Sequence, residues 1–179
     1  MSLTFNAIDV ETANSDPWSI CQIGIATFYN GTIIDTWSSL INPNTLFDWR
    51  NIRVHGIKPK HVNGQPTFCD VQGELKDRLE NTFIVSHTLF DLQVITSSWE
   101  FYDLEQFQFT WLDSCKIAKY AWAKSKNEKG YGLKALAERL EISFNHHDAL
   151  EDAIVSGKIT VAACSDTNLS LEQIAELGL

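Results

Sequence analysis

Two acidic residues, Asp9 and Glu11, stand two positions apart in the stretch AIDVET near the start of the chain. The stretch is rich in β-forming residues, and side chains alternate across a strand, so positions i and i+2 share a face. Two carboxylates on one face repel each other and require a compensating cation. Hard oxygen donors of this kind suit Mg²⁺ or Mn²⁺. The alternative is that both acids simply face solvent at a strand end.

A third acid, Asp91, follows the apolar run FIV and opens a segment with the character of a helix. We include it among the candidates for the same acidic site. The alternative is a structural role as an N-cap, because Asp accepts backbone N–H bonds at helix starts.

The stretch FNHHDALEDAI sets two histidines against three acids. With Asp148 as N-cap and Glu151 at N3, it forms a D-x-x-E variant of the capping box. His147 and Asp152 then take the N′ and N4 positions, which meet across the first helical turn. We therefore expect His147 and Asp152 to face one site together. His146 should point elsewhere if the segment before the cap is extended, as an exposed loop histidine.

The order of these groups resembles the DEDD exonucleases with a catalytic histidine (DEDDh), the family of the proofreading epsilon subunit of bacterial DNA polymerase III. The resemblance covers about residues 4–163, and it includes the HGI stretch between the first two family motifs. Where many relatives carry TTG after the acid pair, this chain has Thr12–Ala13–Asn14, and His87–Thr88 replaces a common HN. Both departures concern how the terminal nucleotide is held. The matching catalytic residues are Asp9, Glu11, Asp91, His147 and Asp152.

The resemblance implies 3′→5′ hydrolysis of phosphodiester bonds at DNA or RNA 3′ ends, with release of nucleoside 5′-monophosphates. Its two cofactor ions are Mg²⁺ (or Mn²⁺), which would neutralise the carboxylates and activate water. The general base would be His147, a task suited to an imidazole near neutral pH. The resemblance also implies that Thr12, Ala13 and Phe90 contact the terminal nucleotide. The implied metal ligands are Asp9, Glu11, Asp91 and Asp152.

The elements that must position these residues follow from the pattern of the chain. An Asn30–Gly31 pair between two β-rich runs predicts a hairpin, so residues 1–41 should form a three-stranded antiparallel meander. Strands then alternate with helices, which indicates an α/β sandwich on a mixed sheet. The resemblance implies a ribonuclease H-like fold, a five-stranded mixed sheet flanked by helices. Expected strands are 4–11, 18–29, 32–41, 82–87 and 108–114; expected helices are 67–79, 114–126, 132–142 and 149–164.

Length and composition bound the remaining possibilities. At 179 residues we expect a single exonuclease domain over 1–179, with its core at 4–163 and a short tail at 165–179. No run of about 18 apolar residues predicts a membrane span, and no secretory leader is evident. Four scattered cysteines indicate reduced thiols and a cytoplasmic protein. The net charge of −9 argues against non-specific coating of nucleic acid.

Residues 116–139 form a basic region within this acidic chain, with seven Lys or Arg against two Glu. Tyr120, Trp122 and Tyr131 lie among the cations and could stack on bases of the incoming strand. The alternative is a solvated helix face with core aromatics. The cations are Lys116, Lys119, Lys124, Lys126, Lys129, Lys134 and Arg139.

Two other functions stay open at this stage. The chain could be a non-catalytic module that recognises a 3′ end, although all five chemical residues are present. It could also be a proofreading subunit in DNA repair or replication, with a polymerase partner bound by a tail helix that presents Leu171, Ile174 and Ala175. A free-standing nuclease is the simpler interpretation.

Overall fold

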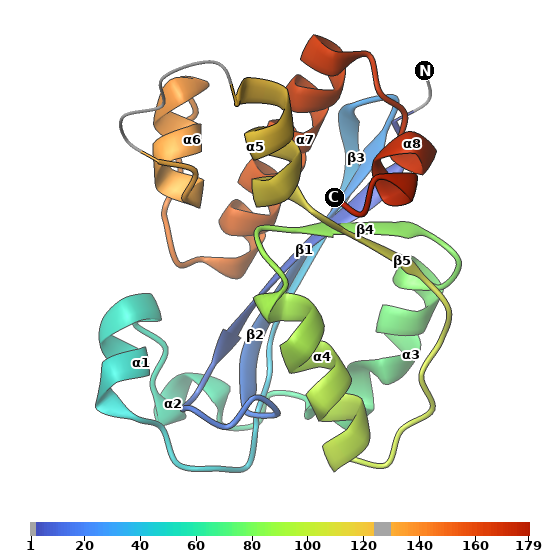
Figure 1. The fold of residues 1–179 in the computed structure, drawn as a ribbon. Helices are drawn as coiled ribbons and strands as arrows, with labels where there is room; N and C mark the ends of the chain where they lie inside the picture. The colour runs from blue at the N-terminus through green and yellow to red at the C-terminus, as the bar shows by residue number, and fades with distance from the viewer. Residues whose placement is uncertain (1–2, 124–129) are drawn as a thin grey trace.

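Five strands form one mixed sheet in the order β3-β2-β1-β4-β5 (Figure 1). The computed structural model describes residues 3–123 and 130–179. The first three strands pair antiparallel, whereas β4 and β5 run parallel to β1. This arrangement confirms the predicted five-stranded mixed sheet. The strands are β1 (Phe5–Thr12), β2 (Ile20–Tyr29), β3 (Thr32–Leu40), β4 (Phe83–Ser86) and β5 (Thr110–Asp113).

Helices cover both faces of the sheet, with α5 to α8 above it and α3 and α4 below it in the view of Figure 1. Two short helices, α1 and α2, lie at the edge near the ends of β1 and β2. The helices are α1 (Trp49–His55), α2 (Pro59–Val62), α3 (Phe68–Leu79), α4 (Phe90–Phe101), α5 (Ser114–Trp122), α6 (Leu133–Arg139), α7 (Ala149–Thr167) and α8 (Leu171–Glu176).

The alternation of side chains along β1 decides on which face of the sheet the two acidic side chains lie. Ile8 and Val10 are buried in the core against α3 and α4, as the sequence predicts. Ala7 is buried on the opposite face, in the core that includes α7. Because Asp9 and Glu11 continue the phase of Ala7, they lie on the α7 side of the sheet.

The hairpin between β2 and β3 is present at the predicted pair. Asn30 and Gly31 have φ of 51° and 76°, and positive φ at both central residues is what a type I′ turn requires. The predicted strand boundaries are close, although β2 begins at Ile20, two residues later than expected, and β5 is shorter than its predicted range.

The tail helix does not offer the docking face that its sequence suggested. Leu171 and Ile174 are 1% and 0% exposed and belong to the core above the sheet. Ala175 packs against the same core. The apolar stripe of α8 therefore covers the chain's own fold.

Among the helices that the structure describes, none is long and apolar enough to cross a membrane.

Candidate active site

The central strand β1 supplies the first two carboxylates. Asp9 and Glu11 are half-buried, and β1 is hydrogen-bonded on both sides, to β2 and to β4. A strand held on both edges has little freedom to move its side chains apart. The sequence prediction that these two acids share a face is confirmed by the burial of Ile8 and Val10 on the other face.

Asp91 reaches the same site from the start of α4. Its side chain is 3% exposed, and its Oδ1 accepts a hydrogen bond of 3.0 Å from the backbone N–H of Val10. The N-cap alternative is wrong, because Leu89 occupies the N-cap position and Asp91 lies inside the first turn. The hydrogen bond to Val10 aims the carboxylate at β1, between Asp9 and Glu11 in the chain.

The fourth carboxylate, Asp152, lies in the first turn of α7 and is 4% exposed. Asp148 caps this helix as predicted, since its Oδ1 accepts from the N–H groups of Leu150 and Glu151 at 3.1 and 3.3 Å. The cap fixes where α7 begins and therefore which side chains of its first turn face β1.

A glycine on β2 permits the close approach of α7. Gly24 is the register partner of Asp9. A Cβ built at Gly24 would collide with the backbone of Ala149 and Leu150. Gly24 therefore brings the first turn of α7 against the sheet beside Asp9. Sequence reasoning missed this residue, since an isolated glycine in a strand signals only a close backbone approach of unknown partner.

The two histidines lie in a tight turn just before α7. The N–H of Asp148 donates to the carbonyl of Asn145 at 3.2 Å, and His147 has φ of 71°. Positive φ at the third residue of a four-residue turn is the type II pattern. The two imidazole rings stack with centroids 3.8 Å apart and an interplanar angle of 19°. The turn places both imidazoles beside Asp152.

The expectation that His146 points away from the site is wrong. Its Nδ1 lies 3.0 and 3.1 Å from the two carboxylate oxygens of Asp152. The prediction assumed an extended segment before the cap, whereas the chain turns there. His147 contacts Asp152 through its backbone N–H at 3.2 Å, and its Nδ1 lies 4.0 Å from Oε1 of Glu11. His147 and Asp152 do meet, as predicted, but His146 shares their site.

The carboxylates carry more negative charge than the protein around them compensates. Burial, then repulsion from Asp91, raises the pKa of Asp9 well above its ordinary value. Burial, then repulsion from Asp152, raises the pKa of Glu11 to about 8. Burial also raises the pKa of Asp91 to about 7. Among the described residues, no Lys or Arg forms an ion pair with these four acids.

This donor set fits divalent cations. Ligand oxygens of Asp9, Glu11 and Asp152 lie within 4.8 Å of one another, and no Lys or Arg among the described residues forms an ion pair with them. Hard carboxylate oxygens are the ligands that Mg²⁺ and Mn²⁺ prefer. The residues therefore could hold the metal that the sequence implies.

Two of the three predicted substrate-binding residues line a pocket next to the carboxylates. Thr12 and Phe90 line a hollow of about 300 Å³, and Phe90 is 51% exposed. Ala13, the third, is fully buried and does not line the hollow. The other lining residues are Asn14, Ser15, Asp16, Pro17, Asn51, Gln93 and Val94.

Two residues of α1 hold the end of β1 at Thr12. The side-chain amide of Asn51 donates to the carbonyl of Thr12 at 2.9 Å, and Nε2 of His55 lies 3.2 Å from the same oxygen. Burial lowers the pKa of His55, so its ring favours the neutral form. The HGI stretch contains His55, but nothing in the sequence indicates its contact with Thr12.

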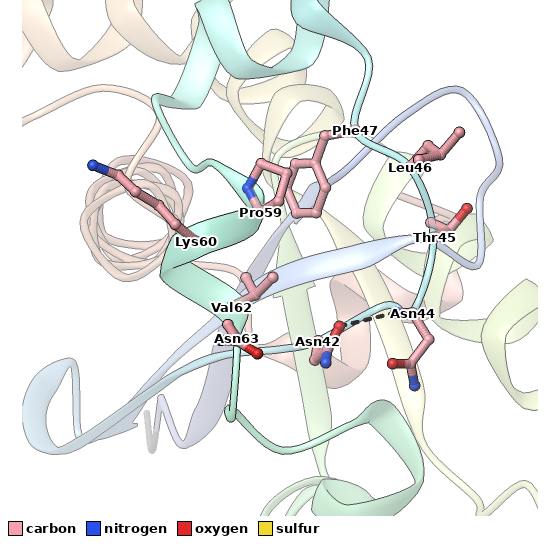
Figure 2. A pocket seen from close by; sticks show the side chains of 9 residues that line it. All are labelled: Asn42, Asn44, Thr45, Leu46, Phe47, Pro59, Lys60, Val62 and Asn63. Atoms are coloured by element: carbon pink, nitrogen blue, oxygen red, sulfur yellow. Dashed lines mark hydrogen bonds between the residues drawn. The ribbon is translucent and has the colours of Figure 1, made fainter.

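A second cavity, larger than the hollow lined by Thr12 and Phe90, is lined by none of the four carboxylates (Figure 2). It measures about 830 Å³ and opens between residues 42–47 and α2. Phe47, Pro59 and Val62 form its apolar part, and asparagine side chains lie along one side. No acid or histidine lines it, so it offers no catalytic groups.

The described part of the basic region at 116–139 combines exposed cations with aromatic side chains of the core, and its exposed cations are Lys116, Lys119, Lys134 and Arg139. Trp122 is 6% exposed and its Nε1 donates to Asp166 at 2.8 Å, so this ring belongs to the core. Tyr131 is half-buried and donates its hydroxyl to the carbonyl of Trp122. Exposed groups on α5 include Lys116, Lys119 and Tyr120. Lys124, Lys126 and Lys129 lie outside the described residues.

Comparison with known proteins adds evidence of ancestry. A family model described as "Exonuclease" matches residues 7–160. A curated relative, the "3'-5' exonuclease DinG" of Staphylococcus aureus, is 30% identical over 164 residues. That match covers 89% of this chain but only 18% of the relative, so the chain spans less than a fifth of the curated proteins that it resembles.

Two solved structures share the fold. Exonuclease X in complex with 5′ overhanging duplex DNA has a TM-score of 0.74 and 20% identity, with 96% of this chain and 98% of that chain covered. The nuclease domain of 3'hExo, described as a DEDDh family member bound to rAMP, has a TM-score of 0.75 and 18% identity, over 92% and 93%. These likenesses confirm the predicted fold class.

Proposed function

The chain belongs to the exonuclease family, and we propose that it is a metal-dependent 3′→5′ exonuclease of the DEDDh type. It hydrolyses phosphodiester bonds at DNA or RNA 3′ ends and releases nucleoside 5′-monophosphates. The observation that carries the proposal is the convergence of four carboxylates from β1, α4 and α7 beside two imidazoles. No Lys or Arg within the described residues pairs with them.

The metal-binding role belongs to Asp9, Glu11, Asp91 and Asp152. Two bound Mg²⁺ or Mn²⁺ ions would supply charge neutralisation and lower the pKa of a water molecule. The protein contributes the fixed positions. Asp91 is restrained by the N–H of Val10, and Asp152 by the side chain of His146. Both restraints keep carboxylate oxygens directed at the site before substrate binds.

His147 is the general base in this proposal. Burial, then the neighbouring charge of His146, lowers its pKa, so the ring is neutral and able to accept a proton near pH 7. Its side chain is 40% exposed, which allows a water molecule to reach it. His146 has a different role, because its Nδ1 is engaged with Asp152 and orients that carboxylate.

The terminal nucleotide occupies the hollow lined by Thr12 and Phe90. The exposed ring of Phe90 offers a face for stacking on a base. Asn14, Asn51 and Gln93 supply amide groups around the same hollow. Ala13 lies beneath this hollow, where its small side chain packs in a separate apolar cluster with Cys21, Ile57 and Val62.

The wider biological setting is also proposed. We treat residues 1–179 as one exonuclease domain with a cytoplasmic location and a role in DNA repair or replication. Its resemblance to the epsilon subunit would imply a polymerase partner, whereas the similarity to DinG places a related domain within a much longer protein. The burial of α8 against the core gives no support to docking through that helix.

Incubation with 5′-labelled DNA and RNA oligonucleotides in Mg²⁺ or Mn²⁺ tests the proposal. The labelled strand should shorten stepwise from its 3′ end, and a bulky 3′ block should slow the reaction strongly. Asp9→Asn serves as the matched inactive control. Release of a labelled mononucleotide at the first time point would show attack from the 5′ end and exclude this function. Binding without cleavage would favour the non-catalytic module instead.

A further inference from the structure

The chain contains a second cationic segment, and it lies next to the site. Residues 49–69 hold Arg50, Arg53, Lys58 and Lys60 and no Asp or Glu, in a protein of net charge −9. Arg50 forms an ion pair with Asp48 at 2.7 Å. Arg53, Lys58 and Lys60 are exposed, and no acidic partner within 4 Å is recorded for them among the described residues. The segment presents positive charge that the fold does not use.

One face of helix α1 contacts the site through two side chains. Asn51 and His55 hold the carbonyl of Thr12. At 100° per residue, Trp49, Arg50 and Arg53 fall on the opposite side of the helix, whereas Val54 lies on its flank.

The outward face of α1 is both apolar and exposed. Trp49 is 67% exposed and Val54 is 51% exposed, and α1 contributes no buried residue to the core. Leu46, just before the helix, is 86% exposed. Exposed apolar side chains that stand beside cations are typical of interaction surfaces.

The segments on either side of α1 line the cavity of Figure 2. Its lining residues Phe47 and Pro59 lie in the segments that directly precede and follow α1. Lys60 stands at its edge, and the side chains of Asn44 and Asn63 lie along its rim. Apolar faces with adjacent amides and a cation match the needs of a nucleobase and its phosphate.

We propose that the outward face of α1 and the cavity lined by its flanking segments bind the single-stranded part of the substrate upstream of its terminal nucleotide. The inference rests on the proposed function. Aromatic side chains that stack on bases, beside cations that follow the backbone, are the usual means of binding single strands. The contacts of Asn51 and His55 with Thr12 connect this surface to the hollow for the terminal nucleotide.

The α5 surface is the competing location, and its composition is less suitable. Its exposed aromatic is Tyr120, while Trp122 is committed to the core. Lys116 on the same helix donates to the carbonyl of Gly178 at 3.3 Å. The exposed aromatic side chain of α1, Trp49, is thus larger and more exposed than Tyr120 of α5, at 67% against 51%.

The test compares Trp49→Ala/Arg53→Ala with the matched pair Lys119→Ala/Tyr120→Ala, each in the inactive Asp9→Asn background with Mg²⁺. Anisotropy of a fluorescent 20-nucleotide strand measures binding without cleavage. The α1 variant should bind roughly tenfold more weakly, with a salt slope reduced by about 0.7 for the lost phosphate contact. The α5 variant should bind as its parent does.

The active enzyme supplies a second readout. With the α1 changes, KM for the 20-nucleotide strand should rise towards that of a dinucleotide, while kcat changes little. Equal binding of the α1 variant and its parent would overturn the proposal, as would a larger loss in the α5 variant. An equal loss on the dinucleotide would also overturn it, because α1 would then act only by holding Thr12. Since anisotropy needs no catalysis, strand binding to α1 is measurable even if the proposed hydrolysis fails.

Discussion

The two sides of the carboxylate site are built in different ways. On the strand side, Asp9 stands on the central strand of the sheet and Asp91 is fixed by a backbone N–H of that strand. On the turn side, the imidazoles of His146 and His147 are 35% and 40% exposed. The side that holds charge is thus desolvated and rigid, whereas the side that would move a proton remains open to water.

This difference has an energetic consequence. Desolvated carboxylates that repel one another destabilise the metal-free fold, as their raised pKa values indicate. The exposed turn with His146 and His147 has no comparable repulsion between buried charges. Changes on the strand side should therefore affect metal binding and stability together, whereas loss of the His147 imidazole on the turn side should affect mainly the rate.

Metal removal should have the largest effect. Excess EDTA should abolish hydrolysis, and Mg²⁺ or Mn²⁺ should restore it, because the four carboxylates then regain their compensating charge. Ca²⁺ should restore little, since it takes more and looser ligands. The measurement is cleavage of a labelled oligonucleotide. Full activity in EDTA would exclude the metal-dependent mechanism.

Asp9→Asn should reduce activity to background while it raises the melting temperature of the metal-free protein. The substitution keeps the shape of the side chain and removes one of the crowded charges. Thermal unfolding in EDTA measures the second effect. A lower melting temperature would contradict the idea that the strand side stores repulsion.

His147→Ala should lower the rate by about 10² to 10⁴-fold, the usual loss of a general base, and remove the acidic limb of the pH–rate profile. Mg²⁺ affinity should change little, because the ligands are carboxylates.

His146→Ala is the matched comparison and should stay within about a few-fold of the wild-type rate. Its contact with Asp152 orients a ligand without accepting the proton of the attacking water. The opposite ranking of the two substitutions would assign the base to His146.

Gly24→Ala should displace α7 from β1, because the new methyl group meets the backbone of Ala149 and Leu150. We expect a loss of stability of about 1–3 kcal/mol and weaker Mg²⁺ binding, measured by denaturant unfolding and calorimetry. Gly73→Ala is the control, since nothing lies within 4 Å of its Cβ. That change, inside α3, should stabilise the protein slightly. Equal effects of both would mean that α7 does not need the close approach.

The pH dependence of metal-free stability should be the smallest effect. The pKa of Glu11 is raised from 4.5 to about 8, and that of Asp91 from 3.8 to about 7. The folded state then retains protons that the unfolded state releases, so stability falls as pH rises from about 4 to about 8. In EDTA, the melting temperature should therefore drop between pH 5 and pH 8. Mg²⁺ should reverse this trend. A rise with pH in EDTA would contradict the desolvation of the strand side.

Some features of this protein were determined by the sequence alone, because they depend on neighbours in the chain. The alternation of β1 put Asp9 and Glu11 on one face, and Asn30–Gly31 required a hairpin. Asp148 was recognisable as the cap of α7. Family membership was also predictable, since five residues stood in the right order, although their individual roles remain predictions.

Other features were decided only by the tertiary structure. Asp91 was indistinguishable from an N-cap until the N–H of Val10, 81 positions away in the chain, was seen to donate to it. The outward cations of α1 have no periodicity that separates them from an ordinary surface helix. The physical reason is the same in each case. Hydrogen bonds and burial between segments that are distant in the chain fix where a side chain points, and the pattern of neighbouring residues in the sequence does not indicate these contacts. His146 shows most clearly what the sequence does not determine. The chain turns at His147, where φ is 71°, and the ring of His146 stacks on that of His147 in the site.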